Sequence, residues 1–87
     1  MHKLEIEDKL TGIFNNIFDN PKVEQAKSSE VPNEWFKILK GDSLDILQLV
    51  IYTEETFHIE VDDEEVLTWD TFNAIVEYIS EEIEKQR

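Results

Sequence analysis

The 87-residue chain has no cysteine and only two glycines, two prolines and one methionine. Without cysteine it can form neither a disulfide nor a thiolate metal site, which is typical of a protein kept in a reducing compartment. It also has no run of about 20 apolar residues, the length that a membrane-spanning helix needs. Its charged first residues do not form an apolar signal segment. From these absences we expect a cytoplasmic protein without a targeting segment or membrane insertion.

The length of the chain limits its architecture. Eighty-seven residues are enough for one small domain with a modest core, but too few for a large active-site cavity between domains. We therefore expect residues 1–87 to form a single domain, and we expect this domain to be monomeric.

Positive charge is scarce, because 8 basic residues stand against 21 acidic ones and the formal net charge is -13. The deficit is concentrated in residues 41–84, which contain 14 acids and neither Lys nor Arg. A field of this sign repels nucleic acid phosphates and anionic lipid, and it raises the encounter rate with a partner that presents a basic patch. The charge therefore favours proteins with basic surfaces as partners and argues against nucleic acid. For any single glutamate, a general role in keeping the protein soluble is an equally good explanation.

The spacing of apolar residues predicts an all-α chain. Repeats of three and four residues mark a first helix near 4–18 and a second helix from about 43 to 56. A single turn follows near 63–67. The last helix begins after Asp70 or Thr71, either of which can cap it. The sequence therefore predicts four helical stretches.

The connections between these helices are less regular. Residues from Asp19 to Pro32 are polar and show no period, so we expect a long loop there. Asn33 can cap a short turn that carries Trp35, and burial of this aromatic side chain would pin the loop to the helices. Residues 57–61 alternate like a strand, but we favour an extended connection because a lone strand has no partner for its backbone groups.

The most informative motif is Gly41-Asp42-Ser43-Leu44 at the start of the second helix. The Asp42 carboxylate can accept hydrogen bonds from the free N–H groups of the first turn. A phosphodiester on the Ser43 hydroxyl would lie beside these donors, at the positive end of the helix dipole. An Asp-Ser pair alone is a common helix cap, so its surroundings must decide its meaning.

The second helix has more apolar residues than one buried stripe needs. Leu44 and Ile51 are seven residues apart and therefore share a face. Gln48, Glu54 and Glu55 form a polar border beside that face. Two interpretations stay open, because this face could contact a partner through the helix or could be buried in a small core.

The motif at the second helix resembles the phosphopantetheine attachment site of acyl carrier proteins, whose usual form is Leu-Gly-(Ala/Gly)-Asp-Ser-Leu. Leu39 before it and the run Asp45-Ile46-Leu47-Gln48-Leu49-Val50 after it extend this similarity. Further similar segments are Glu54-Glu55-Thr56-Phe57-His58-Ile59, Asp63-Glu64, Thr71-Phe72 and Val76-Glu77-Tyr78-Ile79. The resemblance covers residues 39–79 well. It implies a small four-helix bundle with a long loop between helices 1 and 2 and a short third helix.

The resemblance also implies a function. Ser43 would carry a 4'-phosphopantetheine arm, which a phosphopantetheinyl transferase takes from coenzyme A, and Asp42 would help to bind metal in the transferase complex. The arm would hold acyl groups as thioesters in fatty-acid, polyketide or related lipid biosynthesis, and the chain itself would not be an enzyme. Acyl-loading and acyl-processing enzymes with basic patches would dock at Leu44, Asp45, Gln48, Ile51, Glu54 and Glu55. Candidates for a cavity that shelters the acyl chain are Ile46, Val50, Phe57, Ile59 and Ile75.

The chain departs from the family pattern at several positions. Lys40 stands where glycine is usual, and Gln48 stands where an acid is common. Such departures fit a specialised carrier at least as well as the housekeeping one. A peptidyl or aryl carrier of a nonribosomal peptide pathway, which shares the mechanism, is one alternative. An unmodified acidic protein-interaction domain is another.

Catalytic and metal sites have little support in the sequence. His58 has no cysteine to act with and no neighbouring serine, so we expect it to be a solvated loop residue. The acidic run Asp62-Asp63-Glu64-Glu65 lacks the alternating acids and the central glycine of an EF-hand calcium loop. We therefore expect no specific metal site and no catalytic residue.

Overall fold

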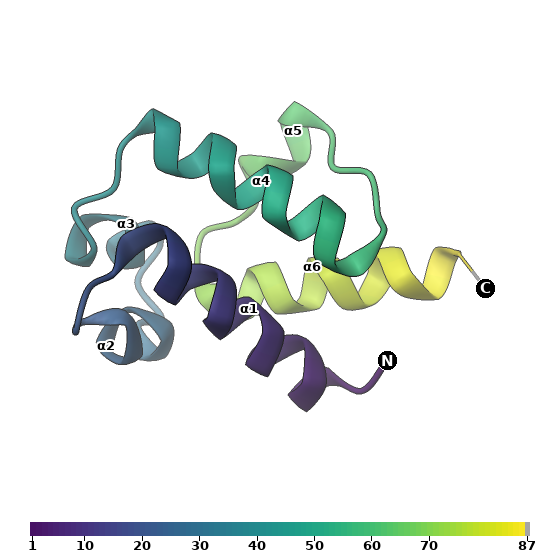
Figure 1. The fold of residues 1–87 in the computed structure, drawn as a ribbon, viewed down its shortest axis with the longest axis horizontal. Coiled ribbons are helices and arrows are strands. Elements are labelled where there is room, and N and C mark those ends of the chain that lie inside the picture. Colours follow the sequence, from purple (N-terminus) through teal and green to yellow (C-terminus); the bar gives the residue numbers. More distant parts are fainter. Residues whose placement is uncertain (87) are drawn as a thin grey trace.

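The computed structural model describes residues 1–86. Within this range the chain forms six helices and no strand: α1 (Lys3–Phe18), α2 (Val23–Ser28), α3 (Glu34–Ile38), α4 (Ser43–Phe57), α5 (Asp63–Val66) and α6 (Phe72–Lys85). Figure 1 shows α1 running from the N-terminus toward α2 and α3, while α4 and α6 run back toward the end where both termini lie. The predicted all-α bundle is confirmed. Across residues 1–86, no helix has both the length and the apolar character needed to cross a membrane.

The centre of the core is the apolar face of α1, which packs against α4 and α6. Phe14 is fully buried, and its ring centre lies 5.2 Å from that of Phe72 and 5.3 Å from that of Trp35. These contacts join α1, α3 and α6. The other buried residues of α1 are Ile6, Leu10 and Ile13.

The loop predicted between Asp19 and Pro32 is wrong in one respect, because it contains α2. Val23 and Ala26 are the buried residues of this helix, which packs against α1, α3 and α6. Two apolar residues among polar neighbours do not produce a recognisable period. A helix of 6 residues is also too short to be stable alone, so tertiary packing must stabilise it.

Helix α3 holds the connection against the bundle. Trp35 is buried as predicted, and its Nε1 donates a hydrogen bond to the backbone oxygen of Trp69 at 3.1 Å. The N–H of Asn33 donates to the backbone oxygen of Asp70 at 2.7 Å. Asn33 precedes α3 with a left-handed φ of 65° and makes no side-chain cap hydrogen bond. The predicted capping role of Asn33 is therefore wrong.

The second half of the chain follows the prediction closely. The extended connection, predicted over residues 57–61, comprises residues 59–62 and has no strand pairing, because Phe57 still belongs to α4. The buried side chains of Ile59 and Val61 attach this connection to the core. Thr71, and not Asp70, caps α6, because its hydroxyl accepts from the N–H of Ala74 at 3.0 Å. Helix α5 is a single turn with no buried residue.

The Thr53 hydroxyl on α4 is fully buried and has no hydrogen-bond partner among the described residues. A buried hydroxyl without a partner costs roughly 1–3 kcal/mol. Valine has nearly the same shape without the hydroxyl, so we expect Thr53→Val to raise the free energy of unfolding by about 1 kcal/mol in urea denaturation. Thr53→Ser keeps the hydroxyl and loses a methyl group, and should lower the stability instead. A destabilised Thr53→Val protein would show that the hydroxyl finds a partner in solution.

Candidate functional site

The start of α4 is a closed hydrogen-bonded turn in which Ser43 is the first helical residue. Oδ1 of Asp42 accepts from the N–H of Asp45 at 3.1 Å, and Oδ2 of Asp45 accepts from the N–H of Asp42 at 3.0 Å. This reciprocal capping box confirms Asp42 as the N-cap and does not use the Ser43 hydroxyl. Ser43 itself is exposed. This exposed residue lies at the N-terminal end of a 15-residue helix, where the helix dipole favours an anion.

The two residues before this turn, Lys40 and Gly41, pack closely against α3. Lys40 has a left-handed φ of 54°, a conformation that glycine adopts without strain and other residues adopt at a cost. The N–H of Gly41 then donates to the backbone oxygen of Phe36 at 3.0 Å. The position of Ser43 thus depends on a close approach between Gly41 and Phe36.

This approach leaves no room for a side chain at Gly41. A Cβ atom placed there would lie 2.6 Å from Cδ1 of Phe36 and closer still to its Cε1, whereas carbon atoms pack at about 3.5–4.0 Å. We expect Gly41→Ala to displace the Phe36 ring and to lower the free energy of unfolding by roughly 1–3 kcal/mol. Urea denaturation measures this change.

Gly12 provides the matched control for Gly41. It lies inside α1, and a Cβ atom there would meet nothing within 4 Å. Gly12→Ala should therefore stabilise the protein by about 0.5–1 kcal/mol, because glycine is unfavourable within a helix. If both substitutions changed the stability in the same direction, the proposed collision at Gly41 would be wrong.

Ser43 stands at the edge of an apolar hollow between α4 and α5. We call it the Ser43 hollow; it has a volume of about 250 Å³ and is lined by Ser43, Ile46, Leu47, Val50, Asp63 and Val66. A second space, the Trp69 hollow, has a volume of about 330 Å³ and is lined by Asn33, Trp35, Phe36, Ile46, Val66, Leu67 and Trp69. Ile46 and Val66 line both, so the two hollows adjoin at these side chains.

The candidate cavity residues fall into two groups in the structure. Ile46 and Val50 line the Ser43 hollow. Phe57, Ile59 and Ile75 are instead buried in the main core and line neither hollow. Asp63 and Val66 were missed, because the position of the single-turn α5 beside α4 leaves no period in the sequence. A cluster of acids followed by an isolated Val was the only available signal.

The outer face of α4 is exposed, so its burial in a small core, one of the two interpretations left open by the sequence, is wrong. Leu44 is 60% exposed and Ile51 is 44% exposed. Leu47 and Tyr52 are also exposed, and we call these four residues the apolar strip. Exposed apolar side chains gathered on one helix face are typical of a protein contact site. The strip begins directly after Ser43.

The polar residues predicted beside the strip fall into two groups. Gln48 and Glu55 are exposed on the surface. Asp45 and Glu54 are half-buried and already form hydrogen bonds inside the protein. Asp45 belongs to the capping box, while Oε2 of Glu54 accepts from the N–H of Val61 at 2.9 Å. Two of the predicted docking residues therefore also hold the structure together.

The structural role of Glu54 can be measured. Removing its carboxylate leaves the N–H of the buried residue Val61 without its partner, so we expect Glu54→Ala to lower the free energy of unfolding by roughly 1–2 kcal/mol. Glu55→Ala is the matched control, because the neighbouring Glu55 is exposed and its loss should change stability by less than about 0.5 kcal/mol. Equal stabilities of the two variants in urea denaturation would contradict this role.

Tyr78 on α6 has a raised pKa, to which nearby carboxylates contribute. Burial, followed by the nearby carboxylates of Glu82, Glu65, Asp62 and Glu54, raises the pKa of Tyr78 to about 12. These carboxylates disfavour one more negative charge in their midst. The negative field predicted from the sequence is thus present around α6 and the extended connection.

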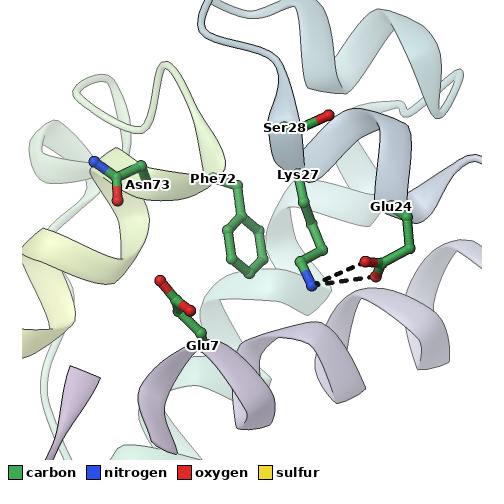
Figure 2. Close-up of a pocket in the computed structure, with 6 residues that line it drawn as sticks. All are labelled: Glu7, Glu24, Lys27, Ser28, Phe72 and Asn73. Carbon is green, nitrogen blue, oxygen red and sulfur yellow. Dashed lines mark hydrogen bonds and ion pairs between the residues drawn. The ribbon is translucent and has the colours of Figure 1, made fainter. Parts of the chain in front are cut away.

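A more polar hollow lies among α1, α2 and the start of α6 (Figure 2). It has a volume of about 260 Å³ and is lined by Glu7, Glu24, Lys27, Ser28, Phe72 and Asn73. Nζ of Lys27 lies 3.1 Å from Oε2 of Glu24 and 5.4 Å from the centre of the Phe72 ring. The Lys27 charge is therefore already engaged. This hollow contains none of the predicted site residues, so the start of α4 is the stronger candidate site.

Potential metal ligands are not clustered within residues 1–86. No three His, Cys, Asp or Glu side chains in this range are grouped to hold a metal ion. His58 is exposed and ends α4 with a left-handed φ of 56°. It is therefore a solvated turn residue, as predicted.

Most of the chain is similar in sequence to known proteins. Residues 18–79 match the family model for the phosphopantetheine attachment site. The chain is 32% identical to the acyl carrier protein of Buchnera aphidicola over 80 residues, which cover 92% of this chain and 96% of that protein. It is 41% identical to the acyl carrier protein of Wolinella succinogenes over 70 residues, which cover 72% and 92%. The matched residues 18–79 include the start of α4 and α5.

Proposed function

Because the chain belongs to the acyl carrier protein family, we propose that Ser43 is the residue to which its 4'-phosphopantetheine group is attached. The chain is a carrier protein with this group covalently bound. When attached, the group supplies a thiol that holds an acyl chain as a thioester. Members of the family are carriers rather than catalysts, and they interact with phosphopantetheinyl transferases and acyl-processing enzymes.

The surroundings of Ser43 fit a phosphodiester. The observation that carries the proposal is an exposed hydroxyl on the first residue of α4, outside the capping box. The positive end of the helix dipole stabilises an anion there by roughly 0.3–1 kcal/mol. Oδ1 of Asp42 makes the cap, and we assign its other carboxylate oxygen to the metal ion of the transferase complex.

We assign docking of partner enzymes to the outer face of α4. The apolar strip supplies the area that a helix-mediated contact buries, and the exposed Gln48 and Glu55 border it. Asp45 and Glu54 add negative charge beside the strip while their hydrogen bonds hold the helix in place. Complementary basic patches on the transferase and on acyl-processing enzymes would speed the encounter with this face.

We further propose that residues 1–87 are one monomeric carrier domain that works in the cytoplasm. Its pathway on this proposal is fatty-acid, polyketide or related lipid synthesis, with Lys40 and Gln48 fitting a specialised member of the family. The absence of cysteine and the net charge of -13 support this setting.

The test is the intact mass of the protein before and after incubation with coenzyme A, magnesium and a broad-specificity phosphopantetheinyl transferase. We expect a gain of one phosphopantetheine, and fragment ions should place it on Ser43 rather than on Ser28, Ser29 or Ser80. A gain on another serine would overturn the site. No gain with several transferases, on a protein that remains folded, would favour an unmodified acidic interaction domain.

A further inference from the structure

Lys40, three residues before Ser43, carries a positive charge that no carboxylate neutralises. It is exposed and forms no ion pair among residues 1–86, where the ion pairs use Lys3, Lys27 and Lys85. The chain has 21 acidic residues against 8 basic ones, so a shortage of carboxylates does not explain this. The Lys40 ammonium is therefore available to an anion that joins the protein later.

The backbone at Lys40 suits glycine better than lysine. Its φ of 54° lies in the left-handed region, where a residue with a Cβ atom costs free energy that glycine does not. Residues held in such conformations cluster at functional sites. The strain at this position therefore calls for a role of the lysine side chain.

The segment from Lys40 to Ser43 is held by successive backbone hydrogen bonds. The first two N–H groups donate to the backbone oxygens of Lys37 and Phe36 on α3, at 3.1 and 3.0 Å. The N–H of Asp42 donates into the capping box at 3.0 Å. Consecutive Cα atoms are about 3.8 Å apart, so the Cα atoms of Lys40 and Ser43 lie within about 11 Å of each other. The four-carbon stem of lysine can span the gap to a phosphodiester on Ser43.

A phosphodiester on Ser43 would have three carboxylates around it. Asp42 and Asp45 form the capping box beside it, and Asp63 lines the same hollow as Ser43. Like charges disfavour each other, although the helix dipole favours an anion at this end of α4. Residues 41–84 contain neither Lys nor Arg. The basic residue nearest to Ser43 along the chain is therefore Lys40.

We infer that Lys40 is a positioning residue for the prosthetic group and that its ammonium pairs with the phosphodiester on Ser43. Lysine binds phosphate groups as a point charge. The pair holds the base of the arm toward the α3 side of Ser43 and offsets the repulsion from the three aspartates. The inference rests on the proposed attachment of the group at Ser43.

The test compares the apo and holo forms of the wild type, Lys40→Gln and Lys40→Arg. Glutamine keeps a long side chain and a strained backbone but removes the charge, whereas arginine keeps the charge. Lys22→Gln is the matched control, because Lys22 is exposed, has no ion pair among residues 1–86, and precedes α2, which packs against α1, α3 and α6. Intact mass reports attachment, so a failed attachment is distinguished from a phosphodiester that is attached but not paired.

Urea denaturation gives the unfolding equilibrium constant of each form. We expect the holo-to-apo ratio of these constants to be roughly two- to fivefold higher in Lys40→Gln than in the wild type at low salt, the range of one exposed ion pair. Lys40→Arg should restore the wild-type ratio, and Lys22→Gln should leave it unchanged. The difference should shrink at about 0.5 M salt, because ions screen exposed charges.

Two results would overturn the inference. Equal ratios in the wild type and Lys40→Gln would show that Lys40 does not interact with the attached group. The same change in Lys22→Gln as in Lys40→Gln would show an effect of net charge alone. A merely structural role of Lys40 would alter the apo and holo forms equally and leave the ratio unchanged.

Nuclear magnetic resonance locates the pair directly. Attachment should shift the ε-methylene signal of Lys40, and salt should reverse part of that shift. The ³¹P signal of the holo protein should depend on salt in the wild type and Lys40→Arg, but less so in Lys40→Gln. A response of the Lys37 signal without one from Lys40 would assign the pair to Lys37 and contradict the inference.

Discussion

Ser43→Ala is expected to abolish phosphopantetheine loading completely while the protein remains as stable as the wild type. Attachment needs an oxygen nucleophile at this position, and alanine has none. No transferase should therefore attach phosphopantetheine at position 43 of this variant. Intact mass after incubation with coenzyme A measures the loss.

Preserved stability is what makes this result informative. The capping box that starts α4 uses Asp42 and Asp45, and Ser43 is exposed. Alanine has the highest helix propensity, so the free energy of unfolding should change by less than about 0.5 kcal/mol. Asp42→Ala should behave differently and cost about 1 kcal/mol, because it removes the cap. Continued loading of the Ser43→Ala protein would overturn the assignment of the site.

Phe14→Ala is expected to cause the largest loss of stability. The side chain is fully buried, and its ring centre lies 5.5 Å from that of Phe18, 5.3 Å from Trp35 and 5.2 Å from Phe72. Truncating a buried phenylalanine costs about 3–5 kcal/mol. A small domain is stable by only about 5–15 kcal/mol, so a large share of the stability would be lost. Urea and thermal denaturation measure the change.

Leu4→Ala is the control for this prediction. Leu4 lies on the same helix and is 64% exposed, so its truncation should change the free energy of unfolding by less than about 0.5 kcal/mol. Similar effects of the two substitutions would mean that Phe14 is not the centre of the core. Phe14→Leu should fall between them, because it leaves a smaller cavity.

Regular patterns in the sequence predicted the long helices and their starts. The buried residues of α1 recur with the helical period, and α6 repeats this pattern from Phe72 onward. Asp42 stands directly before a helical segment, so its capping role was also recognisable, whereas the last helix left Asp70 and Thr71 as alternatives. The excess of apolar residues on α4 was also recognisable, but the sequence did not decide whether this second face was exposed or buried.

Features that depend on three-dimensional placement were not predictable. Helix α2 buries only Val23 and Ala26, too few residues to form a period. Trp35 and Trp69 are 34 positions apart, and the hydrogen bond between them depends on how two connections meet. Glu54 accepts from an N–H 7 residues further along the chain, so its structural role is hidden among the many acids.

The short distance along α4 between Ser43 and the apolar strip affects how tightly partners need to bind. On the proposed assignment, an enzyme that touches the strip meets a substrate tethered one residue away, at an effective concentration of about millimolar. The tether, and not the affinity of the contact, then keeps the enzyme supplied with substrate. Each encounter can be weak and brief, so one carrier can pass its cargo along a series of enzymes without any of them retaining it.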